Sequence, residues 1–185
     1  TIQPLGDGNV LIGTYLGGLN VYNKNTGEIA CFKHDENNKK SIAGNKVWDI
    51  AIDKKGLVWI ATDSGLDRFD PGTQTFIHYP ELDDMKSGIK WISVDDENDI
   101  WLGAEITRVY RPGFGIVSTF KESLWKIFED RNGNIWATSN RGIVLYDKYK
   151  GAIKSYNEHN GIACNFTYCI LEDNDGRLWI STING

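Results

Sequence analysis

Apolar and polar residues alternate with a period of two in several short stretches of this sequence. Residues 47–52 read VWDIAI, which predicts a β-strand with one row of large apolar side chains. A polar turn follows at residues 53–56, and further strands are expected at 57–62, 66–69 and 74–79. Short strands joined by tight turns are typical of antiparallel meanders, and no convincing amphipathic helix is found. The pattern therefore predicts an all-β protein.

The four-strand pattern is repeated along the chain. A Trp that follows a glycine-containing turn anchors the later copies, at Trp59, Trp101, Trp136 and Trp179, and Leu11 takes that place in the first copy. The intervals are 48, 42, 35 and 43 residues. Repeats of about 40 to 50 residues are those of propeller blades with four strands each.

Other columns of the repeat agree at fixed distances from the anchor. In each of the last four copies an Ile stands nine residues before it, a Gly or Asn three before it, and an Asp six before it. The Asp column consists of Asp53, Asp95, Asp130 and Asp173. An Asp accepts hydrogen bonds from the backbone of a turn, and Gly or Asn tolerates a positive φ. These two columns therefore predict a hairpin turn before every anchor strand.

We name the strands of one blade A to D, from axis to rim, and predict a partial β-propeller. It would contain three complete four-stranded antiparallel blades and two incomplete terminal blades, with seventeen strands in all. Residues 1–5 would be the remnant of a preceding strand A or a loop. The chain would form one propeller fragment, 1–185, with blades at about 1–34 (partial), 45–80, 87–120, 122–157 and 165–185 (partial).

The open ends of such a fragment would expose a sheet face and unpaired strand edges. We therefore expect the isolated piece to self-associate or to be only marginally stable.

Composition narrows the range of functions. Hydrophobic residues make up 41% and charged residues 24% of the 185 positions, as in soluble globular domains. The net charge of −5 makes nucleic acid an improbable partner of this segment. No apolar run approaches the roughly 18 to 20 residues that span a bilayer, but a segment cut from a longer chain would carry neither anchor nor leader.

The cysteines do not build the fold. Cys31, Cys164 and Cys169 are odd in number and form no CxxC pair, which excludes a disulfide scaffold at this length. We expect three small half-buried thiols, with a Cys164–Cys169 disulfide as the open alternative.

Two stretches resemble a known family. Residues 47–71 read VWDIAIDKKGLVWIATDSGLDRFDP, and residues 160–182 contain NGI, then Asn165, then ILEDNDGRLWIST. Both resemble the two-component regulator propeller repeat, roughly N-x-V-x-x-I-x-E-D-x-x-G-x-L-W-I-G-T-x-x-G-L-x-R-F-D-P, and the resemblance covers nearly the whole chain. The third copy departs most, because Asn98 replaces the Gly and the turn around Glu105 is a residue shorter. The loop Asn of the pattern is kept in only two copies.

The resemblance implies a role in signalling. Such repeats form paired propellers in the periplasmic part of membrane-anchored sensor histidine kinases, many of them hybrid kinases with their own DNA-binding output. They respond to oligosaccharides and switch on genes for polysaccharide use. The kinase would lie elsewhere in a homodimeric parent protein, since this segment contains no kinase motif.

Propellers usually bind ligands where the D–A and B–C loops meet, and sugars stack on aromatic faces. The anchor Trp residues suit packing between blades and are not candidates. Aromatic rings near the start of strand A, together with polar groups around them, fit a sugar site better. One of these rings, Trp91, is one residue out of phase and is expected to face a different surface. The candidates are Trp48, Lys90, Trp91, Trp125 and Tyr168 on strand A, and Asp63, Glu105, Asn140 and Arg141 in the B–C turns.

The sequence gives little support for metal binding or catalysis. Residues 173–176 read DNDG, like the start of a calcium loop, but the twelfth position is Asn184 instead of Glu. The three His residues show no metal-ligand spacing, and no nucleophile motif is present. We therefore predict no catalytic residue, no metal and no cofactor.

Two other functions stay open. A propeller glycosidase would need two placed carboxylates, and the repeated Asp stands one residue too early for the Asp box of sialidases. A protein–protein interaction propeller is the other alternative.

Overall fold

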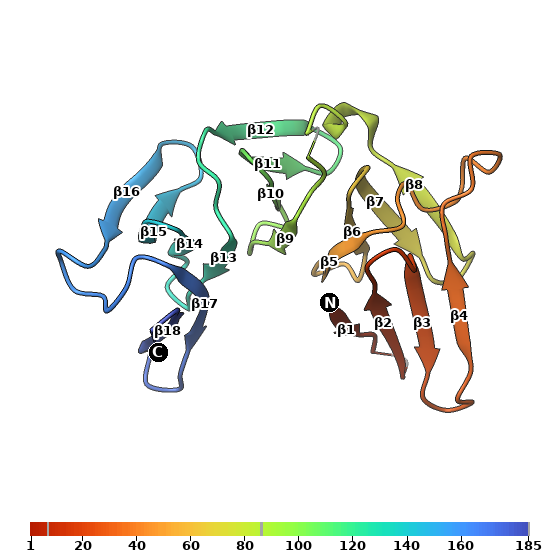
Figure 1. Ribbon diagram of the computed structural model, residues 1–185, viewed down its shortest axis with the longest axis horizontal. Coiled ribbons are helices and arrows are strands. Elements are labelled where there is room, and N and C mark those ends of the chain that lie inside the picture. Colours follow the sequence, from red (N-terminus) through yellow and green to blue (C-terminus); the bar gives the residue numbers. More distant parts are fainter. Residues whose placement is uncertain (7, 86, 185) are drawn as a thin grey trace. The chain divides into compact units, whose positions relative to one another are not determined.

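A computed structural model describes residues 1–6, 8–85 and 87–184. It is an all-β partial propeller, as predicted, and its eighteen described strands form four four-stranded sheets and one two-stranded sheet (Figure 1). The chain divides into two compact units, Thr1–Ile92 and a second from Ser93 onward. Gly185, with which the predicted fifth blade ends, lies outside the described residues.

Each sheet follows the chain order and pairs antiparallel neighbours, so that a blade is one meander. The first and second blades consist of β1 (Ile2–Pro4), β2 (Asn9–Gly13), β3 (Leu19–Asn23) and β4 (Ile29–Phe32), then β5 (Val47–Ile52), β6 (Val58–Thr62), β7 (Gly65–Asp70) and β8 (Thr75–His78). The third consists of β9 (Trp91–Val94), β10 (Ile100–Gly103), β11 (Thr107–Arg111) and β12 (Gly115–Phe120). The fourth and fifth consist of β13 (Lys126–Glu129), β14 (Ile135–Ser139), β15 (Gly142–Asp147) and β16 (Gly151–Tyr156), then β17 (Thr167–Glu172) and β18 (Leu178–Thr182).

The first blade has one strand more than expected. Residues 2–4 form β1, which pairs with β2 in the register Ile2↔Ile12, so the proposed strand A remnant is a real strand. Its three residues carry too little alternation for a sequence pattern to reveal it. The only described helix is the 3₁₀ turn η1 (Pro80–Leu82), which buries Leu82 after β8.

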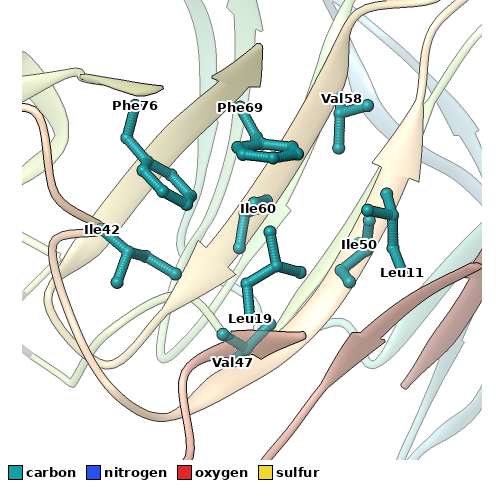
Figure 2. Packing of buried hydrophobic residues seen from close by; sticks show 9 residues of the cluster. All are labelled: Leu11, Leu19, Ile42, Val47, Ile50, Val58, Ile60, Phe69 and Phe76. Carbon is teal, nitrogen blue, oxygen red and sulfur yellow. The ribbon is translucent and has the colours of Figure 1, made fainter. Parts of the chain in front are cut away.

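Neighbouring blades of the first unit share one apolar core. Figure 2 shows Leu11 and Leu19 of the first blade facing Val47, Ile50 and Ile60 of the second, and β2 contacts β5. Strand β6 is buried at all five positions, because a blade that is stacked on a neighbour loses solvent on both faces. Burial of a Leu or Ile side chain stabilises a fold by about 1.5 to 3 kcal/mol.

Every anchor Trp is tied to the Asp six residues before it. The indole N–H of Trp59 donates to Asp53 Oδ2 over 3.1 Å, and Trp101 donates to Asp95 over 2.9 Å. The same bond joins Trp136 to Asp130 (2.9 Å) and Trp179 to Asp173 (2.8 Å).

The other carboxylate oxygen of each Asp holds the turn. Asp53 Oδ1 accepts the backbone N–H groups of Lys55 and Leu57, both at 2.9 Å. In the fifth blade the indole of Trp179, the backbone N–H of Arg177 and the other donors hold the pKa of Asp173 at about 2. One side chain thus fixes both the turn and the ring that packs between blades.

The first blade lacks both members of this pair. Leu5 stands where the Asp would be and Leu11 where the Trp would be. Leu11 is fully buried, and Leu5 packs against the same core. Backbone hydrogen bonds hold this turn, including Leu5 N–H to the Asn9 carbonyl at 2.8 Å.

The fifth blade is the most exposed part of the second unit. Trp179 is 60% exposed, whereas Trp59 and Trp101 are fully buried. Leu171 and Ile183 are exposed as well, because no further blade of the second unit follows this two-stranded sheet among the described residues.

The three cysteines are free thiols, so the alternative of a Cys164–Cys169 disulfide is wrong. Only Cys164 is buried, while Cys31 and Cys169 are exposed.

None of the described helices has the length and apolar character needed to cross a membrane.

Candidate functional site

Four predicted site residues occupy one repeating position, eleven residues before the anchor. They are Trp48, Lys90, Trp125 and Tyr168. The pairing register shifts at Trp48 in β5 and at Tyr168 in β17, which marks a β-bulge at each. A bulge re-aims the side chain of its extra residue, and bulges are frequent beside binding sites. The residue before each of the four is buried, so the bulge separates a core position from an outward one.

In the first unit, the bulge residue Trp48 lies at the centre of a small cluster. Lys90 Nζ lies 4.2 Å from the centroid of the Trp48 ring, and the Tyr15 ring meets that indole edge-on at 5.8 Å. Lys46 Nζ lies 5.6 Å from the Tyr15 ring and 3.3 Å from Asp63 Oδ2. We call these five residues the Trp48 cluster. Two aromatic rings, two ammonium groups and one carboxylate therefore come together at the starts of strands A and the adjoining B–C turns.

Trp91 does not belong to an exposed surface. Its side chain is only 6% exposed, so the ring that was expected to face a different surface is buried. The exposed residue in this copy is Lys90, which holds the repeat position of Trp48, Trp125 and Tyr168.

In the second unit, the B–C turn candidates line a groove of about 510 Å³. Glu105 comes from the third blade, and Asn140 and Arg141 come from the fourth. All three are exposed. The remaining lining residues are mostly polar, with an apolar floor that includes Leu124, Val144 and Tyr146. Burial, together with Glu122, raises the pKa of Tyr146 to about 12, so its phenol stays protonated at neutral pH.

Aromatic rings gather next to this groove. Trp125 and Tyr168 stack with centroids 5.2 Å apart and planes 23° apart, and Phe166 lies 6.2 Å from Trp125. Tyr168 and Phe166 are about half exposed. The backbone N–H of Gly142, next to the groove residue Arg141, donates to the carbonyl of Asn165, next to Phe166, so these rings lie near the fourth-blade end of the groove. We call the groove and these rings the Trp125 site.

Eight of the nine predicted residues thus fall into two groups, and the buried Trp91 belongs to neither. Trp48, Lys90 and Asp63 come together in the first unit. Trp125, Tyr168, Glu105, Asn140 and Arg141 come together in the second.

Sequence reasoning missed Tyr15 and Phe166. Tyr15 stands four residues after its anchor, in the same column as Asp63, Glu105 and Asn140. Extending that column to the first copy would have found it. Phe166 and Lys46 share the column thirteen residues before the anchor. That column carries no consistent residue type, so the repeat gave no signal for Phe166.

Similarity to known proteins supports a signalling family. Residues 41–64 and 161–184 match the family model described as two component regulator propeller. A curated relative, Histidine kinase P4 of Formosa agariphila, is 26% identical over 184 residues, which cover 86% of this chain and 13% of the kinase.

Solved structures share the fold at lower identity. The extracellular domain of the putative hybrid two component system BT3049 from B. thetaiotaomicron has a TM-score of 0.79 at 21% identity, over 96% of this chain and 25% of that domain. Virginiamycin B lyase from Staphylococcus aureus has a TM-score of 0.74 at 17% identity, over 98% of this chain and 62% of the lyase.

This chain spans a small part of its signalling relatives. Each of the two matched segments contains one of the four Asp–Trp pairs, Asp53 with Trp59 and Asp173 with Trp179. Two segments of this chain, one in each unit, are thus similar to repeats of the two component regulator propeller family.

Proposed function

We propose that this chain is a ligand-binding segment of the periplasmic sensor region of a two-component sensor histidine kinase, and that its ligands are oligosaccharides. The relationship to a histidine kinase and to extracellular domains of two-component systems supports the sensory role. The parent protein would be a membrane-anchored homodimer that controls genes for polysaccharide use.

The observation that carries the choice of ligand is the Trp125 site. Sugars present flat apolar faces and a rim of hydroxyl groups, so they bind where an aromatic ring lies beside convergent polar groups. Tyr168 offers an exposed ring that is held in place by stacking on Trp125. Glu105, Asn140 and Arg141 offer both acceptors and donors within the adjoining groove.

A panel of neutral and acidic oligosaccharides, added to the purified protein, tests the proposal. The melting temperature should rise with at least one of them, because a ligand that binds only the folded state stabilises it. No change of the saccharide should be detected by chromatography. Product formation would instead support the glycosidase alternative, and no response across the panel would support protein partners.

A matched pair of variants locates the response. Tyr168→Ala should abolish the rise caused by a neutral oligosaccharide. Phe114→Ala removes another exposed ring, in the β11–β12 turn, and should leave that rise unchanged. Equal effects of the two variants would contradict binding at the Trp125 site.

A further inference from the structure

The Trp48 cluster holds a surplus of hydrogen-bond donors. The indole N–H of Trp48 is buried and has no acceptor within the described residues. An indole N–H only donates, and an ammonium group only donates. The one carboxylate of the cluster, Asp63, is already engaged by Lys46 at 3.3 Å. A buried donor without a partner is rare and calls for an explanation.

Lys90 adds a positive charge that protein groups leave unneutralised. Its side chain is exposed, and its ammonium lies over the Trp48 ring at 4.2 Å. Among the described residues it forms no ion pair with a carboxylate. The cluster therefore carries a net charge of about +1, although the whole chain carries −5.

The equivalent positions in the second unit differ in charge. There the residues eleven before the anchor are Trp125 and Tyr168, two rings stacked 5.2 Å apart. In the first unit the same positions hold Trp48 and Lys90. The repeat thus offers one platform that suits a neutral sugar face and another that presents a cation.

We propose that the Trp48 cluster binds the acidic group of an oligosaccharide, either a uronate carboxylate or a sulfate ester. This inference rests on the proposed function of oligosaccharide binding and names the ligand class of the first unit. The acidic group accepts from Lys90, and displacement of the exposed Lys90 and Tyr15 side chains brings it to the Trp48 indole N–H. Tyr15 then supplies the ring on which the sugar stacks.

Calorimetric titration of the purified protein tests this assignment with four probes. They are an oligogalacturonate, a sulfated galacto-oligosaccharide, a neutral galacto-oligosaccharide and inorganic sulfate. We expect one of the two acidic saccharides to bind at least tenfold more tightly than the neutral one, as charged hydrogen bonds predict. Whichever of the two acidic saccharides binds more tightly shows whether the cluster prefers a carboxylate or a sulfate ester.

Two variants assign the binding to the cluster. Lys90→Gln should weaken binding of the acidic saccharide about tenfold or more. Lys55→Gln removes the same charge from an exposed lysine in the turn between β5 and β6 and should change the affinity less than about twofold. The Trp48 indole N–H signal, identified by its loss in Trp48→Phe, should move on addition of the acidic saccharide.

The outcomes separate this inference from the proposed function. Tighter binding of the neutral saccharide, or equal losses in Lys90→Gln and Lys55→Gln, would overturn the acidic assignment and leave oligosaccharide binding intact. Sulfate that binds as tightly as the sulfated saccharide would show an anion site without sugar recognition and also overturn it. If none of the saccharides binds, both the acidic assignment and the proposed function are overturned.

Discussion

Lys148 forms a buried ionic link between the third and fourth blades. Its ammonium lies 2.6 Å from Asp95 Oδ2 and 2.8 Å from Asp99 Oδ2. The Lys148 side chain is 7% exposed and the two aspartates are 1% exposed. Arg111 donates two further hydrogen bonds to Asp99, at 2.7 and 2.6 Å.

The pKa shifts follow from these contacts. Burial would lower the pKa of Lys148, but hydrogen bonds from its ammonium to Asp95 and Asp99 outweigh burial and raise that pKa. Burial would raise the pKa of Asp99, but hydrogen bonds from Arg111 and Lys148 lower it. The link therefore stabilises the fold from above the unfolded pKa of an Asp, near 4, up to at least the unfolded pKa of a Lys, near 10.

Replacing Lys148 by Met should destabilise the protein by about 3 kcal/mol at pH 7. Removing one member of a buried ion pair leaves an uncompensated charge, and this typically costs about 3 to 5 kcal/mol. We take the lower end because Asp99 keeps Arg111, and Asp95 keeps the indole N–H of Trp101.

Urea unfolding of the wild type and Lys148→Met at pH 7 and pH 4 measures this effect, with the exposed Lys150→Met as the control. Without the Lys148 ammonium the Asp99 carboxylate gains a proton more readily, so the difference from the wild type should shrink at pH 4. A difference below about 1 kcal/mol at pH 7, or one that does not depend on pH, would refute the reasoning.

Three further predictions follow from single features. His78 contacts Asp67 and Asp83 through its two ring nitrogens, at 3.1 and 2.9 Å, and the hydrogen bond to Asp67 raises its pKa above 6.5. The stability that these contacts give is present below the unfolded-state pKa of His78 and is lost as pH rises through its folded-state pKa. NMR titration should show that the pKa of His78 falls in Asp83→Asn. An unchanged pKa would contradict the contact. Trp59→Phe leaves Asp53 Oδ2 buried without its donor and should cost at least 1 kcal/mol more in urea unfolding than Trp179→Phe at the exposed copy; equal losses would argue against burial as the cause. Leu171→Glu should lower self-association seen by light scattering, since Leu171 is 64% exposed on an unstacked sheet face; a wild type that stays monomeric at all concentrations would contradict this.

The sequence predicted the features that repeat. The Asp and Trp columns predicted the turns and the packing between blades because each acts within one copy, through bonds between near neighbours in the chain. The bulge position was also found from its column, although the bulge itself was not. Its offset from the anchor is the same in every copy, which is what brought Trp48, Trp125 and Tyr168 together as candidates.

Features that depend on contacts between blades escaped prediction. Trp91 was expected to face a different surface, but its side chain is buried and its neighbour Lys90 is exposed. Lys148 stands where the family pattern has Pro, and Asp99 stands where the second copy has Leu57. Neither departure predicts an ion pair by itself, because the two residues are 49 positions apart and meet only when the third and fourth blades stack.

The Asp–Trp pair constrains how these repeats can change. Losing the Asp alone leaves an indole N–H without an acceptor, and losing the Trp alone leaves a carboxylate in an apolar interface. Replacing only one member of the pair is therefore unfavourable, whereas replacing both by apolar residues avoids either loss. In the first blade Leu5 and Leu11 stand at these two positions, and both pack in the apolar core. A designer who lengthens or shortens this array should treat the two positions as one unit of sequence.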